Sequence, residues 1–147
     1  MSCPHCDTEV VAFPVPDALR AHAPGRATAA SICPRCLAVE AVGETERTDG
    51  DGSEATGGDS APEFDRVHGS FPTGDGGVAF ALLIGTLPSI ALNKASARAL
   101  RERAEREGVD TALAFDRLVE AAHEAEIVPE FDLERRVRQL DSLLERR

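Results

Sequence analysis

The chain has 147 residues and a formal net charge of −10 at pH 7, and its six Phe are its only aromatic residues. Burial must therefore come mainly from Ala, Leu and Val, which each remove less apolar surface from water than an aromatic side chain does. This composition excludes a large core. We expect two small ordered pieces joined by a polar stretch.

No basic region leading into an apolar stretch stands at the N-terminus, where Cys3 follows Met1 and Ser2 directly. Such a region is what a secretory signal requires, so we expect a cytoplasmic protein. The uncharged apolar run from Val78 to Leu92 is shorter than the roughly 20 residues that span a bilayer and is interrupted by Gly85 and Pro88. We therefore expect no membrane partner.

Two copies of a Cys-Pro-x-Cys motif stand at Cys3–Cys6 and Cys33–Cys36, separated by 26 residues. Two-residue spacing lets both thiolates of one tight turn point at the same metal, and two such turns complete a tetrahedron. The pattern predicts one structural Zn²⁺ held by Cys3, Cys6, Cys33 and Cys36. Because all four positions are filled by cysteine, the metal would have no open position for a substrate.

The segments around the motifs favour short strands. Glu9–Val15 is rich in residues that prefer strands, Ala27–Ile32 is its candidate partner, and Leu37–Val42 can extend the pairing. This arrangement resembles a zinc ribbon over residues 1–43. Such a small piece cannot bury enough surface to fold alone, whereas structural zinc supplies on the order of 10 kcal/mol, so we expect disorder without metal.

Two other uses of the cysteines fit the sequence less well than a metal site. Two disulfides would also satisfy the pattern, but a reducing cytoplasm disfavours them. Thiol–disulfide oxidoreductases place a Cys-x-x-Cys motif between a strand and a helix, and no strand precedes Cys3. The histidines carry no catalytic pattern, and we expect surface positions for all of them: His5, His22, His68 and His123.

Residues 44–65 hold eight acidic residues and one arginine, which gives a charge of −7. Between Glu44 and Glu63 there is no large apolar residue, so this stretch cannot offset its own ordering entropy. We expect an acidic flexible linker. Residues 1–43 and 66–147 are close to neutral and show no basic patch, so charge does not support nucleic-acid binding.

Residues 66–147 are expected to form a small helical bundle. Val78–Ile84 is apolar on all sides and predicts a buried central element. Asn93 is expected to cap a helix that ends at Gly108, and Asp110 and Asp132 to cap the next two. The apolar stripes of these helices predict their buried faces: Ala97, Leu100 and Ala104; Phe115, Leu118, Val119 and Ala122; Leu133, Val137, Leu140 and Leu144.

The chain combines four features: the paired motifs, the acidic connector, the stretch Gly-Gly-Val-Ala-Phe-Ala-Leu-Leu at 76–83, and Phe-Asp-Leu-Glu-Arg-Arg at 131–136. This pattern resembles a group of small haloarchaeal zinc-ribbon proteins of unknown function. One Lys against fifteen Arg fits such an organism. The resemblance implies an α+β architecture and a cytoplasmic location, and it implies no activity.

Three classes of function follow from these observations. The leading hypothesis is a non-enzymatic adaptor that presents the ribbon, the helices or both to a protein partner. The alternative is a nucleic-acid-associated factor in transcription or translation, which is an analogy from zinc ribbons in general. An enzyme comes last, because no constellation of residues points to a reaction.

Overall fold

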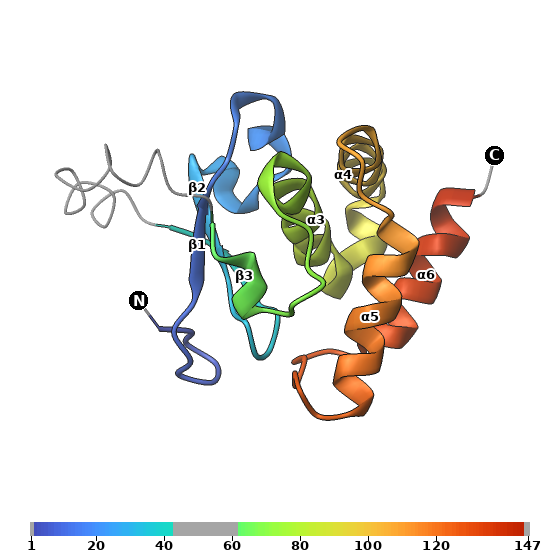
Figure 1. Ribbon diagram of the computed structural model, residues 1–147. Coiled ribbons are helices and arrows are strands. Elements are labelled where there is room, and N and C mark those ends of the chain that lie inside the picture. Colours follow the sequence, from blue (N-terminus) through green and yellow to red (C-terminus); the bar gives the residue numbers. More distant parts are fainter. Residues whose placement is uncertain (1, 43–61, 146–147) are drawn as a thin grey trace, which may run out of the picture.

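The computed structural model describes residues 2–42 and 62–145. Within this part, a small antiparallel sheet forms one side of the molecule and helices α4, α5 and α6 form the other, with helix α3 between them (Figure 1). The chain therefore has the predicted α+β fold. Most of the predicted linker at 44–65 lies outside the described residues.

The sheet contains strands β1 (Val11–Pro14), β2 (Ala29–Ile32) and β3 (Val39–Ala41), in that order and antiparallel. Ile32 of the central strand lies opposite both Val11 and Val39, and it is fully buried. The three predicted strand segments are confirmed, with each strand shorter than its segment. Two 3₁₀ turns, η1 (Asp17–His22) and η2 (Pro24–Arg26), join β1 to β2.

The helical part begins with a short 3₁₀ turn and continues as helices that are all close to their predicted positions. Its elements are η3 (Phe64–Arg66), α3 (Gly74–Thr86), η4 (Leu87–Leu92), α4 (Lys94–Arg106), α5 (Thr111–His123) and α6 (Leu133–Glu145). Phe64 belongs to the predicted linker but is fully buried. The helical part therefore begins before residue 66, at Phe64.

Two of the three predicted helix caps are confirmed. Asp110 Oδ1 accepts a hydrogen bond from the Leu113 N–H at 3.0 Å, and Asp132 Oδ1 accepts one from the Arg135 N–H at 3.1 Å. Asn93 precedes α4 as predicted, but its side-chain amide donates back to the Ser89 carbonyl oxygen at 2.9 Å instead. The kink at η4 brings Ser89 within reach, and this local contact wins over the cap.

Helix α3 is the buried centre of the molecule, as its apolar sequence predicts. Every residue from Gly76 to Ile84 is buried. A Cβ atom on Gly77 would lie 2.4 Å from the Pro72 carbonyl oxygen, and one on Gly85 would lie 3.0 Å from Val39 Cβ. These glycines let the incoming chain and strand β3 approach the helix closely.

One continuous core joins the sheet to the helices. Buried side chains of β1 and β2 belong to the same hydrophobic cluster as those of α3, α4, α5 and α6. A chain of ring contacts crosses it, with centroids 4.6–5.4 Å apart, in the order Phe13, Phe64, Phe71, Phe80, Phe115. The sheet joins this core because it buries its apolar face against α3. The domain boundaries themselves stay a prediction.

The stretch Gly74–Leu92 is long and apolar enough to cross a membrane by length and composition, with a mean hydropathy of 1.6. It is the single such stretch among residues 2–42 and 62–145. However, 67% of it is buried inside the protein. That burial is typical of a core helix, and length and composition alone are weak evidence for a membrane span.

Candidate metal centre

The two Cys-Pro-x-Cys motifs form two turns with the same backbone geometry, which we call the first knuckle (Cys3–Cys6) and the second knuckle (Cys33–Cys36). In the first knuckle the Cys3 N–H donates to the Thr8 carbonyl oxygen at 2.8 Å, and the Asp7 N–H to the Cys3 carbonyl oxygen at 2.8 Å. In the second, Cys33 and Leu37 make the equivalent bonds at 2.9 and 3.0 Å. The repeated motif therefore folds twice into one shape.

The residue after each second cysteine adopts a left-handed backbone conformation. Asp7 and Leu37 both have φ of 65°. This conformation is uncommon outside glycine and is tolerated better by Asp than by Leu. It reverses the chain so that both sulfur atoms of a knuckle face the same side. Leu37 is held in place by its buried side chain, which is 1% exposed.

The four cysteine sulfur atoms lie within 4.8 Å of one another. Cys3 Sγ is 3.5 Å from Cys36 Sγ, and Cys6 Sγ is 3.3 Å from Cys33 Sγ, so the closest pairs join different knuckles. Four sulfur atoms bound to a tetrahedral zinc at about 2.3 Å lie roughly 3.8 Å apart. The observed separations bracket this value. The group can hold one metal ion, and all four cysteines are free thiols.

Backbone N–H groups point at the sulfur atoms. The His5 N–H lies 3.4 Å from Cys3 Sγ, and the N–H groups of Arg35 and Cys36 each lie 3.4 Å from Cys33 Sγ. Such donors stabilise thiolates, which are the form that binds a metal. Four thiolates on one divalent cation carry a net charge of −2, and these dipoles offset part of it.

The cysteines differ in burial and in proton affinity. Cys3, Cys33 and Cys36 are buried, whereas Cys6 is partly exposed. The Thr8 hydroxyl, 3.4 Å from Cys6 Sγ, together with the Thr8 backbone lowers the pKa of the Cys6 thiol to about 6. Burial raises the pKa of the Cys33 and Cys36 thiols above the ordinary value of 9.0. The Cys6 thiol thus loses its proton more readily than the thiols of Cys33 and Cys36.

The connection between α5 and α6, residues 124–132, contacts the second knuckle, a contact that no motif or periodicity predicted. The Val128 N–H donates to the Arg35 carbonyl oxygen at 2.7 Å, and the Glu130 N–H donates to the Cys36 carbonyl oxygen at 3.2 Å. Nothing in the periodicity of the helices locates such bonds, because they involve only backbone atoms of a connecting loop. We call this segment the α5–α6 loop.

His5 projects from the first knuckle, where we expected it to be exposed, and its side chain is 48% exposed. Its two ring nitrogens face two carboxylates. Nε2 lies 3.3 Å from Glu40 Oε2, and Nδ1 lies 3.5 Å from Glu130 Oε1. His5 therefore joins the first knuckle to the middle of β3 and to the α5–α6 loop.

The other histidines contact side chains on separate elements. The pairs are His22 with Ser96 at 2.9 Å, His68 with Glu126 at 3.7 Å and His123 with Glu134 at 3.1 Å. His123 is exposed as predicted, whereas His22 and His68 are half-buried. Within residues 2–42 and 62–145, no carboxylate is hydrogen-bonded to the His22 ring. The His22–Ser96 contact thus ties η1 to α4 without the third member of a hydrolytic triad.

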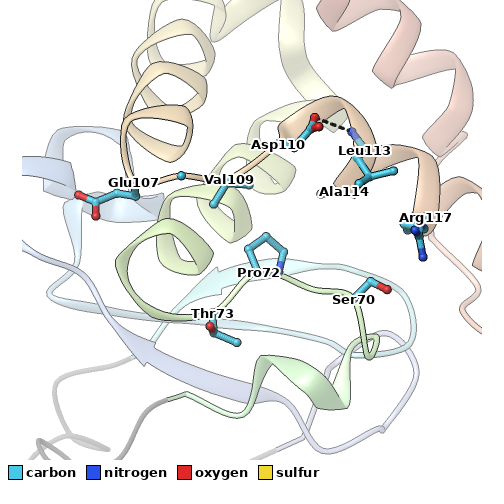
Figure 2. Close-up of a pocket in the computed structure, with 10 residues that line it drawn as sticks. Ser70, Pro72, Thr73, Glu107, Val109, Asp110, Leu113, Ala114 and Arg117 are labelled. Atoms are coloured by element: carbon cyan, nitrogen blue, oxygen red, sulfur yellow. Dashed lines mark hydrogen bonds between the residues drawn. The ribbon is translucent and has the colours of Figure 1, made fainter.

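A surface hollow of about 460 Å³ lies between residues 70–73 and the segment joining α4 to α5 (Figure 2). Two of its charged groups, Asp110 and Glu107, have internal partners. The Asp110 carboxylate caps α5, as the dashed line in Figure 2 shows, and Glu107 pairs with Arg103 at 3.1 Å. Arg117 stands at the α5 side of the hollow. The residues that line this hollow form no catalytic motif recognised in the sequence.

Comparison with known proteins places the chain in a family. The model of the family of unknown function DUF6276 matches residues 2–144. The chain belongs to this family. The match covers both knuckles, the sheet and helices α3 to α6, so the DUF6276 pattern describes the metal centre and the helical part together. No curated protein and no solved structure matches the chain.

Proposed function

We propose that this DUF6276 protein is a non-enzymatic zinc-ribbon protein that acts as an adaptor for a protein partner. The observation that carries the proposal is the closed group of four cysteines, whose sulfur atoms lie within 4.8 Å of one another. A metal held by four thiolates has no open position for a substrate or an activated water, so its role is structural. Zinc is the metal that such tetrahedral thiolate sites select most often.

The backbone around the cysteines supports a structural centre over a redox centre. The first knuckle lies in a turn ahead of β1, and the second lies in the turn between β2 and β3. Neither cysteine pair opens a helix, which is the arrangement that activates the attacking thiol in thiol–disulfide oxidoreductases. Thiolate ligands also require a reducing compartment, and we propose the cytoplasm.

The surface around the metal centre is the proposed contact face for the partner. Pro4, His5 and Arg35 are exposed on the two knuckles. Val128, whose N–H is bonded to the Arg35 carbonyl oxygen, is 48% exposed. The face combines an apolar side chain with a cation on a rigid turn, which suits recognition of another protein.

The first test measures the metal. Native mass spectrometry of the reduced full chain should show one zinc per chain, and replacement by Co²⁺ should give the absorption of a tetrahedral thiolate site. The variant Cys33→Ser should lose this spectrum. A chain that binds no metal, or that contains two disulfides, contradicts the proposal.

The second test measures the partner. Because the sequence resembles haloarchaeal proteins, we propose that the complex forms at high salt, and capture should be carried out there. Val128→Asp should lose the partner, whereas Leu92→Asp should keep it, since Leu92 is 88% exposed but lies on η4, which packs against helices α3, α4 and α6. Loss of the captured material on nuclease treatment would favour the nucleic-acid alternative.

A further inference from the structure

The α5–α6 loop is fixed at its centre and reaches the metal centre with its second half. Ile127 is 2% exposed and belongs to the hydrophobic core. Ala125 adopts a left-handed conformation with φ of 63°, which ends α5 at a small cost in backbone energy. Val128 and the residues after it lie against the knuckles, beyond the anchor that Ile127 provides.

The loop is bonded to both knuckles. Its bonds to the second knuckle are the two backbone hydrogen bonds to Arg35 and Cys36, at 2.7 and 3.2 Å. Its contact with the first knuckle is the Glu130 carboxylate, 3.5 Å from His5 Nδ1. The carbonyl oxygen of Cys36 belongs to one of the four candidate metal ligands. The loop therefore contacts the backbone of the site directly.

These contacts depend on the shape of the knuckles. The Arg35 and Cys36 carbonyl oxygens are in place only while the second knuckle keeps its turn, and the His5 ring is in place only while the first knuckle stands beside it. A metal bound to all four sulfur atoms would fix both conditions at once, since each ligand cysteine lies within three residues of these groups.

We propose that the α5–α6 loop is a metal-dependent latch, in which metal binding at the cysteines orders residues 128–130 against the knuckles. The proposal rests on the proposed metal centre. In the metal-free protein the loop stays anchored at Ile127 while its bonds to Arg35 and Cys36 open. Because coupling between two sites is reciprocal, loss of the latch bonds also weakens metal binding.

The direct test is residue-resolved hydrogen exchange of the full chain, with Zn²⁺ and after removal of metal by a chelator under reducing conditions. The amides of Val128 and Glu130 should exchange at least about tenfold more slowly with zinc bound. The amides of Leu100 and Ala104 in α4 serve as the reference, because both side chains are fully buried away from the knuckles. In the metal-free protein they should still exchange far more slowly than the amides of Val128 and Glu130, because they open only with the whole fold.

Each outcome of this test is decisive. Zinc bound with equal exchange at Val128 and Glu130 overturns the latch and leaves the metal centre standing. A uniform change that includes Leu100 and Ala104 also overturns it, because the loop would then follow global unfolding. Failure of the chain to bind zinc overturns the proposed metal centre, and the latch with it.

A pair of variants tests the reverse direction of the coupling. Val128→Pro removes the N–H that donates to Arg35, whereas Val128→Ala keeps it and shortens the same exposed side chain. Zinc affinity, measured by competition with a chromophoric chelator, should fall about tenfold or more in the proline variant and by less than about twofold in the alanine variant. Equal affinities in two variants that retain native helix content would overturn the proposal.

Discussion

The two knuckles have the same backbone but different surroundings. Each places a residue with φ of 65° after its second cysteine, yet Asp7 is exposed in the first knuckle and Leu37 is 1% exposed in the second. The second knuckle joins β2 to β3 and is bonded to the α5–α6 loop. The first is flanked by Ser2 and Glu9, which form an isolated antiparallel bridge.

This difference indicates that the protein core and the metal contribute differently to positioning the two knuckles. The protein core anchors Leu37, the residue after the second knuckle, because Leu37 is part of the hydrophobic cluster that includes α3, whereas the turn at Cys33–Cys36 takes its final shape with the metal. The first knuckle has few core contacts and depends more on the metal for its position. Packing against the helical core therefore helps to order a metal module that is too small to fold alone.

Metal removal should have the largest effect and should separate the knuckles. Zinc at 1,000 times its dissociation constant stabilises a folded protein by about 4.1 kcal/mol, so chelation should lower the free energy of unfolding by at least about that amount. Residues 2–9 should lose order, while the amides of β2 and β3 keep part of their protection. Chemical denaturation and hydrogen exchange with and without chelator would measure both. An unchanged denaturation midpoint would contradict a metal centre.

Truncation of the buried residue in the second knuckle should come next. Leu37→Ala is expected to lower the free energy of unfolding by about 3 kcal/mol, because it removes a fully buried side chain and leaves a cavity. Asp7→Ala, at the equivalent exposed position, should change it by less than about 0.5 kcal/mol. Denaturation of the metal-loaded variants checks this contrast. Equal losses would mean that the core does not support the second knuckle more than the first.

The pH dependence of zinc affinity should distinguish the knuckles through their thiols. Burial raises the pKa of Cys33 and Cys36, so metal binding must displace both protons throughout the neutral range. Affinity should therefore rise with pH, by at least about a hundredfold per unit, or roughly 2.7 kcal/mol. The Cys6 thiol has a pKa of about 6, so below that pH metal binding must displace its proton as well. The logarithm of the zinc affinity should then rise more steeply with pH, by the contribution of one more proton.

Competition with a chelator between about pH 5 and pH 8 would measure these slopes. The variant Thr8→Val keeps the shape of the side chain and removes the hydroxyl that lowers the pKa of Cys6. In this variant the pH below which zinc affinity falls more steeply should be higher. Zinc affinity that does not change with pH would rule out thiolate ligands.

Relief of backbone strain should have the smallest effect. Asp7→Gly is expected to stabilise the metal-loaded protein by about 0.5 kcal/mol, because glycine adopts the left-handed conformation without steric cost. Leu37→Gly gains the same relief but loses a buried side chain, and it should destabilise the protein by several times that amount. Thermal denaturation of both variants tests the signs. A destabilising Asp7→Gly would show that the Asp7 side chain has another role.

The sequence predicted most of the local structure and the composition of the site. Motif spacing identified the four cysteines that the fold brings together, an apolar run located α3, and apolar periodicity located α4 to α6 with their buried faces. Asp110 and Asp132 were recognisable as caps because the capping group is a side chain that the sequence displays. These features are encoded within a few residues of each other.

The sequence did not predict how the two pieces meet. Composition and the acidic stretch indicated two ordered pieces, but they did not indicate that Phe13 and Phe64 are in ring contact or that Phe64 and Phe71 continue the contacts toward α3. The α5–α6 loop reaches the second knuckle through backbone atoms, which carry no residue-type signal. Long-range packing of this kind depends on the complementary shapes of elements rather than on periodicity.

The chain of phenylalanine contacts gives the protein a built-in optical reporter. Since there is no Trp or Tyr, any near-ultraviolet circular dichroism must come from phenylalanine rings and, when a metal is present, from its thiolate bonds. Five of the six rings form a continuous series from β1 to α5. The phenylalanine signal in the circular dichroism spectrum therefore reports the packing of the sheet against the helices. The same spectrum reports metal binding through the thiolate bonds.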